Sequence, residues 1–468
     1  MKLIITIPDT YPAERDYILS VILKEFLGLD YIIRRAGNAD VCISDKEQKR
    51  CLVIPDGLFA IPKEKWLTKE SLPKQPLEIW DPQAMGFGNS TVLTPVPIIY
   101  GARKRSVDEA NCSQADEDFY LLIDIFGSAF FMLTRYEEIV KQDRDEHDRF
   151  PAWASLAFQE SFLERPIIDE YVEILWLAMK SVWPRLKRNQ RQSRTLVSCD
   201  VDQPYMQNVK SIGMTIRNMA GDLIKRKSIV GAVRTGLNTL CSSWGYYQLD
   251  PMNTFDWIMD VNEKAGNRVA FYFFADHSAD EMGGCYSIQE PRIRELMRRI
   301  HARGHEIGLH SNYSAYLDGA QCEREVHKLR QAMEDEEINQ TEIGNRQHYL
   351  HWRTPETARN LEKAGINYDT TLGYADHPGF RCGTCLPYPM YDIAERKPLR
   401  LRQYPLVLME CTVIDIGYLG MGCTDAALDM MRSLKKRAHQ LGGNFTLLWH
   451  NSRLETREAR SMYLELIA

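Results

Sequence analysis

The sequence lacks the features of an exported or membrane-spanning protein. No window holds about 18 consecutive apolar residues, the length that a transmembrane helix requires. After Lys2, only a short apolar run precedes Pro8 and Asp9, and no small-residue cleavage site follows, so a secretory signal peptide is not expected. These absences predict a cytoplasmic protein without a transmembrane segment.

An excess of positive charge is missing as well. The chain has 58 Lys and Arg residues against 64 Asp and Glu residues, and its net charge of -6 argues against a general nucleic-acid binder. Its 11 cysteines are scattered and odd in number, which predicts reduced thiols rather than a disulfide framework. Hydrophobic residues make up 44% and charged residues 26% of the chain, as in a globular protein, so disordered and fibrous classes are excluded.

The length of 468 residues predicts two domains. The clearest boundary is the polar, basic stretch Lys187–Arg194, which we interpret as a solvated linker. We therefore expect a smaller α/β domain over residues 1–190 and a second domain over residues 194–468. In the first domain, KLIITI, DYIIRR, ADVCISD and CLVIPD are typical of strands, and we expect helices over residues 118–142 and 168–183.

After the linker, short apolar strands alternate with amphipathic helices. This order predicts a parallel sheet with crossover helices, which can close into a barrel. In such folds the reactive side chains lie at the C-terminal ends of the strands. The strands are expected in RTLVSCDVD, NRVAFYFFADH, HEIGLH, RQHYLHW and NFTLLWH.

Ionisable side chains stand at the ends of several of these strands. Asp200 and Asp202 end the first one, and such a pair can divide the work of binding a metal and accepting a proton, although Asp is also an ordinary turn residue. His310 and His450 end two later strands. An imidazole with a pKa near ~6.5 suits proton transfer at neutral pH. We expect all four side chains to meet at one edge of the sheet.

Four segments, in this order along the chain, resemble the polysaccharide deacetylases, a carbohydrate esterase family with a distorted (β/α) barrel. The resemblance implies a metal-dependent carbohydrate deacetylase, a hydrolase that removes the acetyl group from an N-acetylated sugar or saccharide intermediate. The segments are Ser198–Asp202, Val269–Phe274, Gly304–His310 and Leu448–His450, within residues 194–451.

The same resemblance implies a role for each strand-end residue. Asp202 and His310 would bind a divalent metal ion, with Zn²⁺ as the expected ion. Asp200 would accept the proton of the attacking water, and His450 would protonate the departing amine.

One metal ligand of the family pattern is missing. The second histidine normally follows the first by four residues, and Ser314 stands in that place. A hydroxyl is a poor substitute for an imidazole as a ligand. We expect His348 to supply the third ligand, with His351 as one alternative and a site without this ligand as the other.

The first part of the chain resembles an uncharacterised N-terminal domain found in a bacterial subgroup of these deacetylases, which is associated with surface-polysaccharide biosynthesis. The resemblance rests on Asp124–Glu138 and Arg144–Phe150, and Gly379–Cys385 in the second domain belongs to the same subgroup pattern. We expect Arg346 and Arg381 to bind substrate. Arg381 has the alternative role of holding the catalytic carboxylate ionised.

The segment from Tyr205 to Trp244 resembles an insertion in which basic and aliphatic residues alternate. Such a segment can rest on an anionic membrane or bind a lipid-linked phosphate. The alternative is a solvated helix packed over the barrel. The basic residues are Lys210, Arg217, Lys225, Arg226, Lys227 and Arg234.

A second functional class stays open at this point. Ser314 also fits a deacetylase-like protein that has lost catalysis and only binds a saccharide or a partner. Asp200, Asp202 and His450 argue against this class, because a pure binding protein has no need of an acid and a base. A metal site that cleaves another bond, such as an O-acetyl ester, is a third hypothesis.

Overall fold

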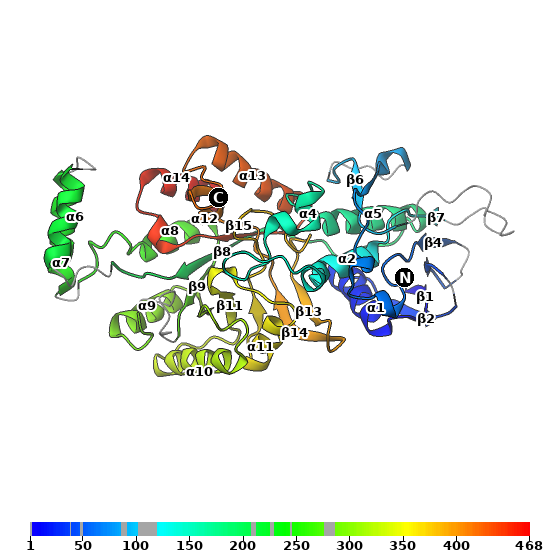
Figure 1. Ribbon diagram of the computed structural model, residues 1–468, viewed down its shortest axis with the longest axis horizontal. Helices are drawn as coiled ribbons and strands as arrows, with labels where there is room; N and C mark the ends of the chain where they lie inside the picture. The colour runs from blue at the N-terminus through cyan, green and yellow to red at the C-terminus, as the bar shows by residue number, and fades with distance from the viewer. Residues whose placement is uncertain are drawn as a thin grey trace.

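The computed structural model shows an elongated molecule whose two ends differ in architecture (Figure 1). A small sheet that contains the N-terminus lies at one end, and a pair of helices projects at the other. A larger sheet with its surrounding helices lies between them. The structure describes residues 2–37, 39–46, 50–85, 91–101, 119–206, 212–224, 229–243, 246–275 and 286–468.

The small sheet has five strands in the order β2-β1-β3-β4-β7. β1 pairs in parallel with β2 and antiparallel with β3, so the sheet is mixed. All four strands expected from the sequence are present. The strands are β1 (Leu3–Ile7), β2 (Tyr31–Arg35), β3 (Val41–Ser44), β4 (Cys51–Ile54) and β7 (Phe119–Tyr120), with β5 (Glu78–Trp80) and β6 (Val96–Ile98) forming a separate pair.

The prediction of one helix over residues 118–142 is wrong. The chain first forms β7, and Asp124 then caps a helix by accepting a hydrogen bond from the N–H of Gly127. That helix ends before Arg135, which adopts a left-handed conformation with φ 54°. The second predicted helix is present. The helices of this end are α1 (Pro12–Leu19), which continues as a π-helix (Ser20–Phe26), α2 (Ile125–Leu133), α3 (Tyr136–Val140), α4 (Leu156–Gln159) and α5 (Ile167–Val182).

The large sheet has nine strands in the order β13-β14-β12-β11-β10-β9-β8-β16-β15. Every pair of strands is parallel except β13–β14. The five predicted segments contribute five neighbouring strands, in the order β11-β10-β9-β8-β16. The strands are β8 (Arg194–Val201), β9 (Val269–Phe273), β10 (Glu306–Ser311), β11 (Gly344–Gln347), β12 (Tyr368–Asp369), β13 (Tyr388–Asp392), β14 (Lys397–Gln403), β15 (Leu408–Met409) and β16 (Asn444–Leu448).

One continuous segment links the two sides of the large sheet. β14 pairs with β12 near one edge, β15 pairs with β16 at the other, and only residues 404–407 separate them. Within this connection, the N–H of Leu406 bonds to the carbonyl of Leu372. The next N–H, that of Val407, bonds to the carbonyl of Thr446. The sheet is therefore curled, with its edges brought together, as the predicted distorted barrel requires.

Amphipathic helices cover the large sheet. In α9, Ile293, Leu296, Met297 and Ile300 share one face at helical spacing and are buried. Gly266 ends α8 in a left-handed conformation, φ 78°. The helices are α8 (Phe255–Ala265), α9 (Pro291–Ala302), α10 (Gly319–Asp335), α11 (Glu356–Ala364), α12 (Glu410–Ile414), α13 (Asp425–Gln440) and α14 (Arg457–Ile467).

The predicted insertion forms two helices, α6 (Ile212–Ile224) and α7 (Ile229–Ser243). They lie side by side and project away from the large sheet (Figure 1). They are not packed over the barrel, which was one expectation for this segment. Of the expected basic residues, Lys210, Lys225, Arg226 and Lys227 lie outside the described residues.

One hydrophobic core continues from the small sheet into the large one. Residues 187–194 are exposed or half-buried, and none of them is fully buried, as expected of a linker. Because the core is shared, the division into residues 1–190 and 194–468 stays a prediction.

The segment Gly379–Cys385 lies where the two parts meet. The backbone N–H of Cys385 donates a 2.8 Å hydrogen bond to Asp169 in the first turn of α5. A Cβ on Gly379 would lie 2.6 Å from the carbonyl oxygen of Leu163, so a side chain at this position would push the parts apart. The segment therefore serves the junction between the two parts.

Glu138 is buried at this junction between two arginines. Arg381 donates to both of its carboxylate oxygens, at 2.9 Å each, and Arg135 donates to one of them at 2.8 Å. All three residues are at most 3% exposed. Burial raises the pKa of Glu138, but the two guanidinium groups outweigh it, and the net pKa lies below the usual range. Arg381 thus serves an internal ion pair.

Candidate active site

The predicted residues converge because parallel strands end at the same edge of the sheet. Asp200 is the penultimate residue of β8, and Asp202 directly follows this strand. His310 is near the end of β10, His348 directly follows β11, and His450 follows β16 after one residue. Neighbouring strands thus bring together side chains that are far apart in the sequence.

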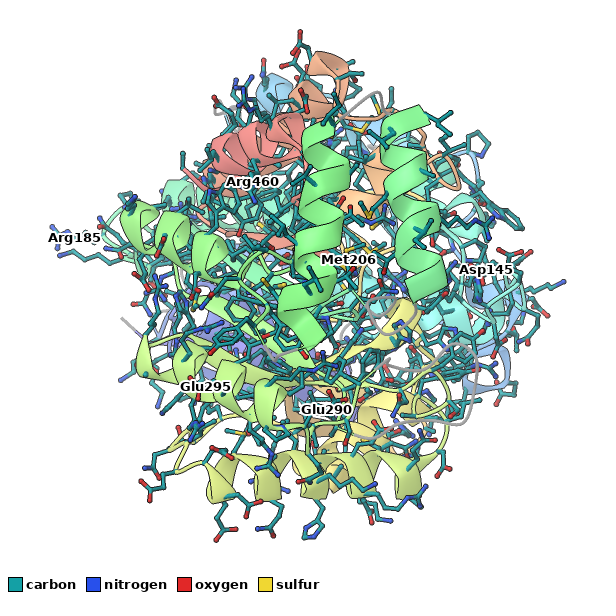
Figure 2. The ribbon with its side chains drawn as sticks, turned by 90° about the vertical axis from the view of Figure 1, so that its left-hand side faces the viewer. Asp145, Arg185, Met206, Glu290, Glu295 and Arg460 are labelled. Atoms are coloured by element: carbon teal, nitrogen blue, oxygen red, sulfur yellow. The ribbon has the colours of Figure 1, made fainter. Side chains whose placement is uncertain are left out.

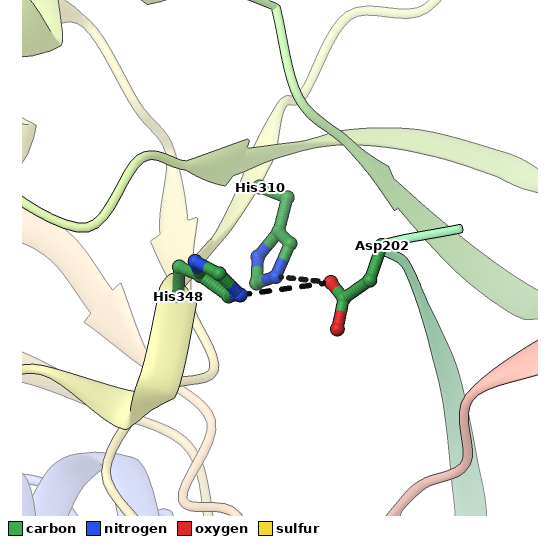
Figure 3. A group of neighbouring side chains, drawn as sticks. All are labelled: Asp202, His310 and His348. Carbon is green, nitrogen blue, oxygen red and sulfur yellow. Dashed lines mark ion pairs between the residues drawn. The ribbon is translucent and has the colours of Figure 1, made fainter. Parts of the chain in front are cut away.

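Three of these side chains form a compact group (Figure 3). Nε2 of His310 lies 3.0 Å from Oδ1 of Asp202, and Nε2 of His348 lies 4.0 Å from the same oxygen. All three candidate ligand atoms are within 4.8 Å of one another. The side chain of Asp202 is 32% exposed, so the group is open to solvent on one side.

The protonation of this group is set by burial and by mutual charge. Burial raises the pKa of Asp202, but the hydrogen bond from His310 and the charges of the imidazoles bring it well below its usual range. Burial lowers the pKa of His348 to about 3, so this ring is neutral at pH 7. A carboxylate and a neutral imidazole are the forms in which these residues bind metals.

The group fits a divalent metal ion of the zinc type. Two nitrogens and one carboxylate oxygen, with a further position open, are a ligand set typical of catalytic zinc. Ligand atoms about 2.0–2.1 Å from a tetrahedral zinc are separated by about 3.3 Å, and the two distances to Asp202, 3.0 and 4.0 Å, lie on either side of this value. Nδ1 of His310 is 2.9 Å from the carbonyl oxygen of Arg346, which directs Nε2 toward the group.

Asp200 is buried next to one of the three candidate ligands, His310. It is 3% exposed, and its Oδ2 is 3.8 Å from Nε2 of His310 and 3.9 Å from Nη1 of Arg346. Arg346 is also buried, and it donates hydrogen bonds to Thr370 and Ser198. We predicted substrate binding for this arginine, whereas the structure buries it, 1% exposed, beside the carboxylate of Asp200. A position beside the catalytic carboxylate is what the sequence had suggested for Arg381.

His450 lies beside the second carboxylate oxygen of Asp202. Its Nε2 is 3.6 Å from Oδ2 of Asp202, and its Nδ1 is 2.6 Å from Oε1 of Glu410. Burial lowers the pKa of His450, but the Glu410 carboxylate and the neighbouring Cys411 raise it well above its usual value. The raised pKa favours the protonated imidazolium, whose Nδ1 lies at Glu410 and whose Nε2 lies near Asp202. Burial raises the pKa of Cys411 to about 11, so its thiol stays protonated.

Glu410 is the residue of the candidate site that we did not predict. It directly follows β15, so the strand-end argument that identified Asp200 applies to it as well. β15 has only two residues, and its neighbours in the sequence do not show a recognisable strand pattern. Only its pairing with β16 places Glu410 beside His450.

Other predicted candidates lie away from the group. Ser314 donates a hydrogen bond to Gln321 and takes no part in the site. Nδ1 of His351 lies 2.9 Å from the carbonyl oxygen of Tyr313, and this histidine is not part of the group. The sequence predicts that the segment RQHYLHW is a strand throughout. It is a strand only as far as Gln347, and His348 begins a 3-10 helix.

The loop 145–150 of the N-terminal part contacts the turn that carries His348. Nη1 of Arg149 donates a 2.9 Å hydrogen bond to the carbonyl oxygen of Tyr349, and Nε is held by Asp145 at 2.7 Å. Tyr349 directly follows His348 and has a left-handed conformation, φ 59°. A non-glycine residue in this region is strained and needs support from its surroundings. Arg149 supplies that support beside a candidate ligand.

Replacement of Arg149 by alanine is expected to weaken metal binding by about 10–100-fold, the usual effect of losing a group that orients a ligand. The dissociation constant would be measured by competition with a chelating dye. Arg144→Ala is the matched control. Arg144 donates hydrogen bonds to the carbonyls of Glu138, Lys141 and Asp143 and lies 4.0 Å from Asp148, and none of these groups is a candidate ligand. Equal affinities of the two variants would contradict the role of Arg149.

Comparison with known proteins identifies the N-terminal part only by a family without an assigned function. Residues 3–184 match the model of a family of unknown function, DUF7033. The match covers the region in which the sequence predicts an uncharacterised domain. A search of curated proteins finds no match.

Three solved structures are similar over about 60% of the chain. A structure described as a polysaccharide deacetylase from Mycobacterium smegmatis has 16% identity and a TM-score of 0.38, over 60% of this chain and 84% of that one. The Puue allantoinase has 15% identity and a TM-score of 0.35, over 59% and 83%. A structure described as a polysaccharide deacetylase from Pseudomonas aeruginosa PAO1 has 14% identity and a TM-score of 0.35, over 59% and 84%.

Proposed function

We propose that this chain is a metal-dependent hydrolase that removes the acetyl group from an N-acetylated sugar or saccharide intermediate, in the synthesis of a bacterial surface polysaccharide. The observation that carries the proposal is the convergence of Asp202, His310 and His348 with a buried carboxylate, Asp200, and an imidazole, His450, on either side. A binding protein would need neither the acid nor the base.

Asp202, His310 and His348 would hold the metal ion, with Zn²⁺ as the ion that suits this ligand set. When bound, the ion lowers the pKa of a water molecule and polarises the acetyl carbonyl.

The remaining steps are assigned to the protein's own side chains. Asp200 takes a proton from the attacking water, and Nη1 of Arg346 lies 3.9 Å from Oδ2 of this carboxylate. As the bond between the acetyl carbon and nitrogen breaks, Nε2 of His450 gives its proton to the amine. Glu410 holds Nδ1 of His450 and stabilises the imidazolium. The products are acetate and the free amine.

Metal content and acetate release test the proposal. Wild-type protein is expected to contain about one zinc or similar ion per chain and to release acetate from N-acetylated saccharides in a chelator-sensitive reaction. His348→Ala is expected to lose the ion, measured by elemental analysis without added metal. His351→Ala is the matched control, because this buried histidine three residues away is not in the group.

Three outcomes would change the assignment. Metal retained by His348→Ala would move the third ligand to another residue. Saturable saccharide binding without hydrolysis, unaffected by chelator, would favour the inactive binding protein. Release of acetate only from O-acetylated saccharides would keep the metal site and change the bond.

A further inference from the structure

The α6–α7 hairpin carries an unusual number of exposed aliphatic side chains. On α7, Ile229, Val233, Leu237 and Leu240 follow one another at helical spacing and are 47–72% exposed. On α6, the exposed aliphatic residues Ile216, Leu223 and Ile224 also share one face. Large exposed apolar surfaces of this kind mark sites that contact a partner or a membrane.

Small and polar residues, in contrast, lie between the two helices. The hydroxyls of Thr215 and Thr239 are 3.1 Å apart. A Cβ on Gly236 would lie 3.3 Å from Sδ of Met219, so the helices approach closely at this point. A helix pair surrounded by water normally buries its large aliphatic residues and exposes its polar ones. The arrangement here is the reverse, and it is typical of helices whose outer faces contact lipid.

The charge of this segment differs in sign from that of the whole protein. Residues 205–244 contain six Lys and Arg residues and one acidic residue, a formal charge of +5, whereas the complete chain carries -6. A second copy of the hairpin would bring the same positive charge and repel the first. An anionic surface, in contrast, attracts basic segments that flank apolar residues.

The hairpin begins and ends close to the candidate active site. Met206 lies only four residues after Asp202, and its N–H donates a 2.9 Å hydrogen bond to Asp250 on the returning segment. The rings of Tyr205 and Tyr247 pack at 4.6 Å beside this bond and fasten the base of the hairpin. Figure 2 shows the two helices in front of the body of the molecule, with Met206 labelled between them.

We infer that the α6–α7 hairpin docks on the surface of an anionic phospholipid bilayer. With 13 and 15 residues, α6 and α7 are about 20–23 Å long at 1.5 Å per residue, less than the ~30 Å hydrocarbon core, so they lie in one interface rather than spanning the bilayer. Among the described residues, every helix is too short or too polar to cross a membrane. Docking brings the edge of the sheet with Asp202 close to the membrane. This step rests on the proposed function: if the chain is a deacetylase, the substrate of the membrane-docked enzyme is a saccharide attached to a lipid.

Sedimentation with vesicles tests the docking. Full-length protein is expected to bind vesicles of phosphatidylcholine with phosphatidylglycerol more tightly than vesicles of phosphatidylcholine alone, and high salt is expected to weaken the binding. The triple variant Ile224→Ser, Ile229→Ser, Leu240→Ser is expected to bind at least about tenfold more weakly, because three exposed aliphatic side chains no longer enter the interface. Ile79→Ser is the matched control, since Ile79 is 69% exposed on β5 in the N-terminal part.

The outcomes separate docking from catalysis. The triple variant is expected to keep the wild-type melting temperature and the wild-type release of acetate from a water-soluble saccharide. Equal binding of both vesicle types, or unchanged binding by the triple variant, would overturn the inference. The inference would also be overturned if the wild type bound no vesicles but formed a dimer that the triple variant does not form. The hairpin would then contact a second copy of the chain instead of a membrane.

Discussion

Replacement of Asp200 by asparagine is expected to lower the turnover of an N-acetylated saccharide by about 10²–10⁴-fold, the usual contribution of a positioned general base. The amide has nearly the same shape as the carboxylate but cannot accept the proton of the attacking water. Because Asp202, His310 and His348 are unchanged, the variant is expected to keep its metal. Turnover would be measured as acetate release, and metal content by elemental analysis.

Asp369→Asn is the control for this experiment. Asp369 is another buried carboxylate at a strand end of the same sheet, but it accepts hydrogen bonds from Asn345 and Thr371 and does not face the candidate ligands. Its replacement is expected to reduce stability and to leave the turnover of the folded protein close to that of the wild type. Activity of Asp200→Asn within a few fold of wild type would remove Asp200 from the proposed mechanism.

Replacement of Glu138 by glutamine is expected to lower the free energy of unfolding by about 3–5 kcal/mol, because it removes the carboxylate partner of the buried Arg381 and leaves the buried Arg135 with Glu137 alone. Arg135 and Arg381 are both 1% exposed, so water cannot replace the lost charge. Urea unfolding at neutral pH would measure the change. Glu295→Gln is the control, because Glu295 and Arg298 form an exposed ion pair, with side chains 60% and 53% accessible, and its loss costs less than about 1 kcal/mol.

The effect of Glu138→Gln is expected to depend on pH. The folded-state pKa of Glu138 lies below its ordinary value of about 4.3, so its charge stabilises the fold above that pH, and this contribution is lost as the pH falls through the folded-state pKa. The difference between wild type and variant is therefore greatest near neutral pH and shrinks in acid. A difference that is small at neutral pH, like that of Glu295→Gln, would contradict the structural role of the cluster.

Much of the fold follows from local patterns in the sequence. Four of the five predicted strands of the large sheet contain short apolar runs, and the structure has strands there because such runs are buried in a sheet. The fifth, RQHYLHW, has no apolar run and is a strand only over Arg346 and Gln347. The helix predicted over residues 118–142 fails for a local reason. The apolar composition of this stretch favours one helix. Asp124 instead begins α2 as its side-chain cap, and Arg135, in a left-handed conformation, separates α2 from α3.

The sequence also identified much of the candidate site, because parallel strands end at one edge whatever the details of their packing. That rule, together with the family resemblance, selected Asp200, Asp202, His310, His348 and His450 as one group, and the structure places them together; their chemical roles stay predictions.

Only the tertiary structure decided which groups support these five. Glu410 reaches His450 through the pairing of β15 with β16, and Arg149 reaches the turn after His348 from the N-terminal part. Arg346 and Arg381 look alike in the sequence, yet one lies beneath Asp200 and the other pairs with Glu138. Contacts between residues far apart in the chain depend on how separate elements pack, and no local pattern of residues encodes that packing. Strand ends and their ionisable residues are local properties, so the sequence by itself determined them.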